Sequence, residues 1–257
     1  MLRTLLICGL VAGALAAVLA TGFATVAGEP AVDDAIAFED QQARAAHEAP
    51  AGEVVSRTVQ KTVGLFTAAA AYCVALGGLF ALVFAVVYGR VAAAPPGRTA
   101  RWLAAAAFVV VFLVPFLKYP ANPPSVGDAE TIGRRTELYL VMVAVSLLSA
   151  LAAVNLRAWL FARPSLRAYA TLGGLTTYAV VVTVAALALP GIHEVPADFP
   201  ATTLWRFREA SIGLQVVLWS TVGLVFGHLA QRAMTRAGAA RPEPADEAVG
   251  QALERAR

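Results

Sequence analysis

Charged residues are scarce in this sequence. Aspartate, glutamate, lysine and arginine make up 14% of its 257 residues, whereas soluble domains carry about 25%. Apolar residues make up 59%, so the composition suits lipid rather than water as the solvent. The formal net charge of +3 is too small to indicate a nucleic-acid partner. The composition therefore predicts an integral membrane protein.

The motifs of common enzymes and metal centres are also missing. The sequence contains no Walker A, GxSxG or HExxH motif, so a hydrolase or ATPase function has no residues to support it. Its two cysteines, Cys8 and Cys73, lie in apolar runs without CxxC spacing, and we interpret them as small buried side chains. We expect no enzyme activity and no permanently bound cofactor.

Six apolar runs are long enough, or nearly so, to span a bilayer as helices, which takes about 20 residues. We expect an all-α bundle, with a transmembrane domain over 1–233 and a flexible tail over 234–257, a terminal segment without a sustained apolar face. The third run is the shortest and contains Pro115, so we expect a kinked or partly irregular helix there. The runs are 4–27, 63–88, 102–117, 138–161, 169–189 and 212–230.

The first run resembles a signal peptide because Arg3 precedes it. Its apolar stretch exceeds the 7–15 residues usual for such a segment, so we expect an uncleaved spanning helix, with cleavage near Ala27 as the alternative. Gly9 and Gly13 form a GxxxG motif in this run, and such spacing permits close packing of helices in membranes.

Lysine and arginine are unevenly divided between the two sides that six spans create. With a cytoplasmic N-terminus, 12 of the 20 lie on the cytoplasmic side, and the short loops 89–101 and 162–168 contain no acidic residue. This distribution follows the positive-inside rule. We therefore expect both termini in the cytoplasm.

Acidic residues gather on the opposite side. Of the 17 aspartates and glutamates, 13 fall in outer segments or at outer helix ends, and four lie in the tail. Acidic walls raise the local concentration of cations, which favours a cation-attracting vestibule. For the long outer segment 28–62, the alternative is a solvated amphipathic helix over 32–48 that lies on the membrane, bounded by Pro30 and Pro50.

Two outer segments share a pattern in which proline-rich chain precedes an arginine pair and a glutamate. It occurs in 118–137 and 189–209, and Arg57 and Lys61 hold the analogous place in the first outer segment. The pattern favours a parallel repeat of helical hairpins, as in some transporters, although repeated arginine anchors at the interface would look the same. The arginines expected to pair with carboxylates or to anchor the interface are Arg134, Arg135, Arg206 and Arg208.

The outer segments also contain groups that bind divalent metals. Proline-rich chain leaves carbonyls without helical partners, and carbonyl, carboxylate and imidazole groups are common metal ligands. No carboxylate lies at mid-membrane, so carbonyls, water or a partner would have to carry a travelling ion. Glu137 and Glu209, at the tops of descending helices, are expected to pass the ion inward. The candidate metal ligands are Glu39, Asp40, His47, Glu137, His193, Glu194, Asp198 and Glu209.

Four segments have distinctive sequences. They are the opening 1–39 with Gly-Glu-Pro at 28–30 and Ala-Ile-Ala-Phe-Glu at 35–39; Ser-Arg-Thr-Val-Gln at 56–60; Lys-Tyr-Pro-Ala-Asn-Pro-Pro at 118–124; and Glu-Val-Pro-Ala-Asp-Phe-Pro-Ala at 194–201, followed by Leu-Trp-Arg-Phe-Arg at 204–208. Together they resemble the CbtA family, a predicted cobalt transporter subunit of bacteria, from Met1 to about Ala233. The resemblance implies about six spans, a bacterial inner membrane, cobalt(II) as the transported ion and a small single-span partner of the CbtB type.

Two functions follow from these patterns. The first is a permease component for cobalt or a related divalent cation, working in the lipid bilayer with a CbtB-like subunit. The second is a non-transporting membrane scaffold or a metal-sensing subunit, which the missing mid-membrane ligands favour. Uptake of ⁵⁷Co with and without the partner distinguishes them.

Overall fold

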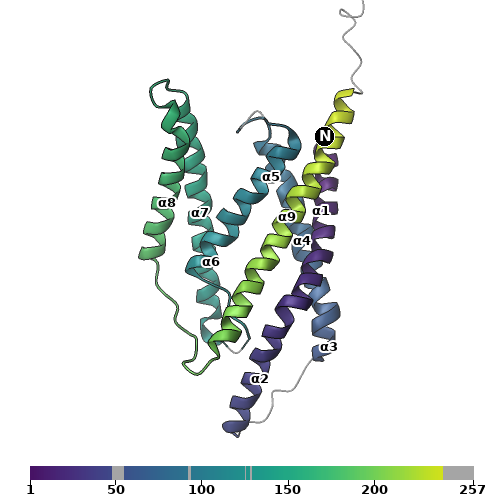
Figure 1. The fold of residues 1–257 in the computed structure, drawn as a ribbon, viewed down its shortest axis with the longest axis vertical. Coiled ribbons are helices and arrows are strands. Elements are labelled where there is room, and N and C mark those ends of the chain that lie inside the picture. The colour runs from purple at the N-terminus through teal and green to yellow at the C-terminus, as the bar shows by residue number, and fades with distance from the viewer. Residues whose placement is uncertain (48–54, 92–93, 125, 128, 240–257) are drawn as a thin grey trace, which may run out of the picture.

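The computed structural model describes residues 1–47, 55–91, 94–124, 126–127 and 129–239, and every regular element among these residues is helical. Six helices long and apolar enough to cross a membrane alternate in direction along the chain (Figure 1). They correspond to the six predicted spans and confirm the all-α prediction. Their bounds are Leu2–Ala45, Arg57–Val87, Pro96–Lys118, Ile132–Phe161, Arg167–Ala188 and Ala201–Ala237.

The first three of these helices contain a π-helical segment. They consist of α1 (Leu2–Phe23), η1 (Ala24–Gly28) and α2 (Glu29–Ala45); α3 (Arg57–Val59), η2 (Gln60–Gly64) and α4 (Leu65–Val87); and α5 (Pro96–Ala107), η3 (Phe108–Leu113) and α6 (Val114–Lys118). The remaining elements are the short 3₁₀ helices η4 (Ala129–Thr131) and η5 (Arg167–Tyr169) and the helices α7 (Ile132–Phe161), α8 (Ala170–Ala188) and α9 (Ala201–Ala239).

Two helices continue past the bounds that the sequence suggests. Pro30 does not begin a separate helix on the membrane, because α1 and α2 form one helix of 44 residues through η1. Such a helix is about 66 Å long, roughly twice the hydrocarbon thickness, so α2 projects beyond the bilayer. Helix α9 continues to Ala239, past residue 234, and the flexible tail stays a prediction. Residues 240–257 lie outside the described part of the chain.

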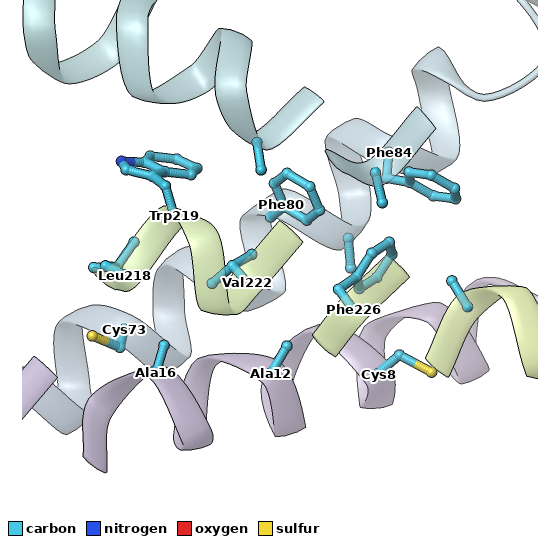
Figure 2. Close-up of a cluster of buried hydrophobic side chains, with 14 of the residues drawn as sticks. Cys8, Ala12, Ala16, Cys73, Phe80, Phe84, Leu218, Trp219, Val222 and Phe226 are labelled. Carbon is cyan, nitrogen blue, oxygen red and sulfur yellow. The ribbon is translucent and has the colours of Figure 1, made fainter. Parts of the chain in front are cut away.

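Helices α1, α4, α5 and α9 form one unit, which we call the four-helix body. Both α4 and α9 pack along α1, and α5 packs along α9. The ring of Phe226 meets Phe80 and Phe84 edge to face, with centroids 5.2 and 4.9 Å apart, above small side chains such as Ala12 and Ala16 (Figure 2). This cluster is the main core of the molecule.

Glycine allows α1 and α4 to touch through their backbones. A Cβ atom built on Gly9 would lie 2.3 Å from the carbonyl oxygen of Gly77, and one on Gly13 would lie 2.3 Å from that of Cys73. Neither position can accept a side chain without separating the helices, because real Cβ atoms do not approach an oxygen so closely. The close packing predicted from the GxxxG motif is confirmed.

Helices α7 and α8 form a second unit, the hairpin arm. They pack on each other, and α7 meets the rest of the molecule through η3 and α6. A second cluster of buried side chains, around Tyr119, Met142 and Val182, lies between the arm and the end of α6. The pair α1 and α4 matches the first expected outward-pointing hairpin, but α5 packs on α9 and α7 packs on α8 instead of α5 on α7 and α8 on α9. The parallel repeat therefore stays a prediction.

The third spanning helix is irregular at the proline, as predicted. Proline has no N–H, and in the π-helical pattern of η3 the carbonyl five residues before Pro115 belongs to Val110. The hydroxyl of Ser146, from α7, donates to that carbonyl at 2.7 Å. Since this uses the only hydrogen of Ser146, the hydroxyl of Tyr178 in α8 donates to Ser146 Oγ at 2.8 Å. A neighbouring helix thus satisfies the freed carbonyl.

The two ends of the bundle differ in charge. Met1, the start of α5, the α7–α8 connection and the end of α9 lie together at what we call the basic end, at the top of Figure 1. Arginines there lie over aromatic rings, with Arg163 Cζ 3.1 Å from the ring centre of Trp159. The end of α2 and the proline-rich loops lie at the opposite, acidic end.

Candidate functional site at the acidic end

The two proline-rich loops of the acidic end hold each other in place. Lys118 Nζ donates to the carbonyl of Leu189, and the Tyr119 hydroxyl donates to the carbonyl of Pro190, both at 2.9 Å. Burial raises the pKa of the Tyr119 phenol, so this hydroxyl stays protonated and remains a donor. These bonds fix the chain that leaves α8 against the end of α6.

Two arginines satisfy further carbonyls of the first loop. Arg208 donates to the carbonyl of Ala121 at 3.4 Å and to Asn122 Oδ1 at 3.1 Å, and Arg135 donates to the carbonyl of Val126 at 3.4 Å. Loop carbonyls were expected to be available as metal ligands. The carbonyls of Leu189, Pro190, Ala121 and Val126 already accept hydrogen bonds from cationic or phenolic side chains. They are therefore weak ligands for another cation.

Ion pairs join the start of α2 to α3 and η2, where the second spanning helix begins. Arg57 Nη2 lies 2.6 Å from Glu29 Oε2 and 3.2 Å from Asp33 Oδ1, and Lys61 Nζ pairs with Asp33 Oδ2. Arg57 and Lys61 therefore bind carboxylates, which is the role expected of the later arginine pairs.

Of the arginine pairs before α7 and α9, only some members bind carboxylates. Arg135 Nε lies 3.3 Å from Glu194 Oε2, which confirms the predicted pairing for that residue. Arg206 reaches Asp34 at 4.0 Å and is exposed. The described hydrogen bonds of Arg208 go instead to uncharged oxygens.

One group of candidate ligands lies where α2 meets the turn before α9. Asp198 Oδ2 accepts a hydrogen bond of 2.8 Å from Gln42 Nε2. The rings of Phe38 and Phe199 pack edge to face, with centroids 5.1 Å apart, and fasten the turn to α2. Glu39 and Asp40 are exposed on α2 in this region. The fold therefore brings acids that are distant in sequence to one surface.

The two candidate histidines and Glu194 lie apart from that arrangement. His47 follows α2 with φ +58° and is exposed. The ring of His193 lies against Gly191, since a Cβ on that glycine would be 2.9 Å from His193 Nε2. Glu194 is directed to Arg135 of α7.

The last two candidates, Glu137 and Glu209, are exposed near the starts of α7 and α9. Among the residues that the structure describes, no three histidine, cysteine, aspartate or glutamate side chains are grouped so that they could hold a metal ion. The eight candidates are thus spread over the acidic end and do not form one metal centre, and metal binding by them stays a prediction.

The membrane-depth cysteines do not supply a metal centre either. Cys8 and Cys73 are both free and buried, and they lie at opposite ends of the core cluster in Figure 2. They serve as small packing residues of α1 and α4, as the sequence predicted.

A cavity with a partly cationic lining at the acidic end was not predicted. Its cations are Lys118, Arg135 and Arg208, which belong to three different helices. The one signal in the sequence is that Arg135 and Arg208 occupy matching places in the two proline-rich patterns. Spacing alone could not show that the two patterns face the same cavity.

The comparisons with known proteins agree with this architecture. A family model described as "Probable cobalt transporter subunit (CbtA)" matches residues 2–231, which takes in the four-helix body and the hairpin arm. Comparison with curated proteins and with solved structures gave no match. The chain therefore belongs to the CbtA family of probable cobalt transporter subunits.

Proposed function

We propose that this chain is the permease component of a system that takes up cobalt(II), or a closely related divalent cation, across a bacterial inner membrane. The observation that carries the proposal is the one-sided distribution of carboxylates in a six-helix bundle: all described aspartates and glutamates lie at one end, beside several basic residues, whereas the described charged residues of the other end are arginines. Family membership supports the metal, and the description as a subunit supports a partner. The acidic end would face outward and both termini the cytoplasm, in accord with the positive-inside rule.

Exposed carboxylates at the acidic end would concentrate the cation. Several carboxylates near one another produce a negative potential that raises the local cation concentration and the association rate by about 10-fold or more at low ionic strength. The effect acts over about 10 Å at 0.1 M salt, so it needs no preformed centre. Among the described residues, the exposed acids of this end are Asp34, Glu39, Asp40, Glu130, Glu137, Asp198 and Glu209.

A partner would complete the path through the membrane. Within the described residues no group of metal-binding side chains lies at membrane depth, and a cation cannot cross hydrocarbon without ligands or water. A small single-span subunit of the CbtB type would supply the missing ligands. This division of labour leaves capture and the helical frame to the present chain.

The lack of a group of metal-binding side chains at membrane depth within the described residues also favours a second candidate function. This is a non-transporting scaffold or metal-sensing subunit that binds cobalt at its acidic end. Such a protein needs no ligands at membrane depth. It would bind the cation without moving it.

Uptake of ⁵⁷Co²⁺ into proteoliposomes separates the two functions. The purified chain is reconstituted alone and with a CbtB-type subunit, and folded protein is verified in each preparation. We expect accumulation of ⁵⁷Co²⁺ with the pair, and slower uptake when Asp40 and Asp198 are both replaced by asparagine. No uptake under either condition would contradict the permease, and binding without uptake would support the sensor.

The proposed orientation has a direct test in single added cysteines, because Cys8 and Cys73 are buried. Ala197 lies at the acidic end and Ser165 at the basic end, and both residues are exposed. Each is replaced by cysteine in a separate variant. A membrane-impermeant maleimide should label Ala197→Cys in spheroplasts and Ser165→Cys only after lysis. The reverse pattern would invert the proposed topology.

A further inference from the structure

The strongest unassigned feature is the cavity between the hairpin arm and the four-helix body at the acidic end. It has a volume of about 390 Å³, within the range of small-molecule sites. Among the described residues that line it, Lys118, Arg135 and Arg208 are cationic and none is acidic. A cavity with this lining repels Co²⁺, so it is chemically distinct from the exposed carboxylates around it.

The described residues neutralise the positive charge in this cavity only in part. Arg135 has Glu194 at 3.3 Å, but Lys118 donates to the carbonyl of Leu189, and Arg208 donates to a carbonyl and an amide oxygen. All three side chains are partly buried. Cations near low-dielectric surroundings attract an anion more strongly than they would in water, and arginine suits phosphate in particular, because its planar fork can donate two hydrogen bonds.

Part of the cavity lining is apolar. Phe112, Phe116 and Ile192 belong to it, and Phe112 lies six residues before Lys118, the last residue of α6, and so deeper in the membrane. The cavity therefore lies where helices leave the hydrocarbon, with the cations nearer the water and the buried aromatic rings toward the membrane interior. An amphiphile with an anionic head fits this division, and basic pockets between spanning helices are known to take lipid headgroups.

We propose that this cavity binds a phosphate oxyanion, with Arg208 and Lys118 as its principal donors. The phosphate comes from the headgroup of an anionic phospholipid whose acyl chains follow Phe112 and Phe116. Because the site joins α6, α7 and α9, the bound phosphate bridges the arm and the body and compensates Lys118 and Arg208, whose partners among the described residues are neutral.

Native mass spectrometry of the full chain with defined lipids tests this site. Phosphatidylglycerol is the probe, phosphatidylcholine is the zwitterionic control, and Arg208→Gln is compared with Arg206→Gln, an exposed arginine two residues away that does not line the cavity. We expect phosphatidylglycerol to bind the wild type, with an affinity lowered about tenfold by Arg208→Gln and unchanged by Arg206→Gln. Equal binding by the wild type and Arg208→Gln would overturn the proposal.

A second binding experiment distinguishes the source of the phosphate. If inorganic phosphate at millimolar concentration binds with the same dependence on Arg208 and displaces the lipid, the site takes the free anion. If it has no effect while the lipid binds, the headgroup is the ligand. Neither probe depends on cobalt transport, so a failed uptake assay leaves this result intact.

A measurement on the wild type covers the case in which Arg208→Gln does not fold. A photoactivatable phosphatidylglycerol is cross-linked to the reconstituted protein, and the modified peptides are identified. Cross-links to the start of α7 and to η3–α6 are expected. Cross-links confined to the arginine-rich basic end would overturn the proposal.

Discussion

The four-helix body and the hairpin arm are similarly apolar, yet they are held together in different ways. In the most apolar windows of the first and last helices, 44% of the residues are buried, compared with 22% in α7 and 17% in α8. The body has backbone contact at glycines and a phenylalanine core, whereas the arm meets the third spanning helix through the smaller cluster around Tyr119 and Met142 and through the hydrogen bond of Ser146. In lipid, close packing and hydrogen bonds rather than hydropathy decide which helices associate, so two units of similar hydropathy can differ in how much of each is buried.

The largest effect is expected from separating α1 and α4 in the body. Gly13→Leu would place a side chain against the Cys73 carbonyl, 2.3 Å from the ideal Cβ position, and should destabilise the protein by about 3 kcal/mol or more. Gly22→Leu is the matched control on the same helix, since nothing lies within 4 Å of its Cβ position. Unfolding in bicelles measures both, and equal losses would contradict the account of the body.

A smaller effect is expected where the arm meets the third helix. Ser146→Ala removes the donor to the Val110 carbonyl and the acceptor of Tyr178, which should lower the free energy of unfolding by about 1–2 kcal/mol. Ser149→Ala is the control, because Ser149 is also buried in α7 but donates to Val145 of its own helix. Comparable losses in the two variants would show that Ser146 does not couple the units.

The smallest effect is expected at the proline-rich loops. Tyr119→Phe deletes the hydrogen bond to Pro190 and should cost about 1 kcal/mol, while Tyr169→Phe at the exposed basic end should cost almost nothing. Because burial raises the pKa of Tyr119 above its usual value of about 10, the phenol stays protonated. The difference should therefore be constant between about pH 6 and pH 9, and a decline in that interval would contradict the assignment.

The spans were predictable because apolar runs of sufficient length have few alternatives to a membrane helix. The irregularity near Pro115 followed from its missing N–H, and the contact at Gly13 followed from the GxxxG spacing. The continuation through Pro30 was not predictable in the same way. A π-helical segment precedes that proline, and the sequence does not reveal such a segment.

The pairing of helices and the composition of the site could not be predicted. Lipid-facing and protein-facing residues are both apolar, so no periodicity shows that α5 packs on α9 or α7 on α8. The carboxylates were expected to gather around a metal, but Glu194 is directed to Arg135 and Asp198 accepts a bond from Gln42. Those contacts join residues far apart in the sequence, and the spacing of residues along the chain cannot predict such contacts.

Cobalt-edge anomalous diffraction from crystals of the chain soaked in Co²⁺ tests most directly whether the acidic end captures the cation. The account predicts anomalous density at the acidic end, beside α2 and the turn that contains Asp198, and its loss in a variant with Asp40→Asn and Asp198→Asn. Density confined to the basic end or to the cysteines of the body would contradict it, as would no density at the acidic end.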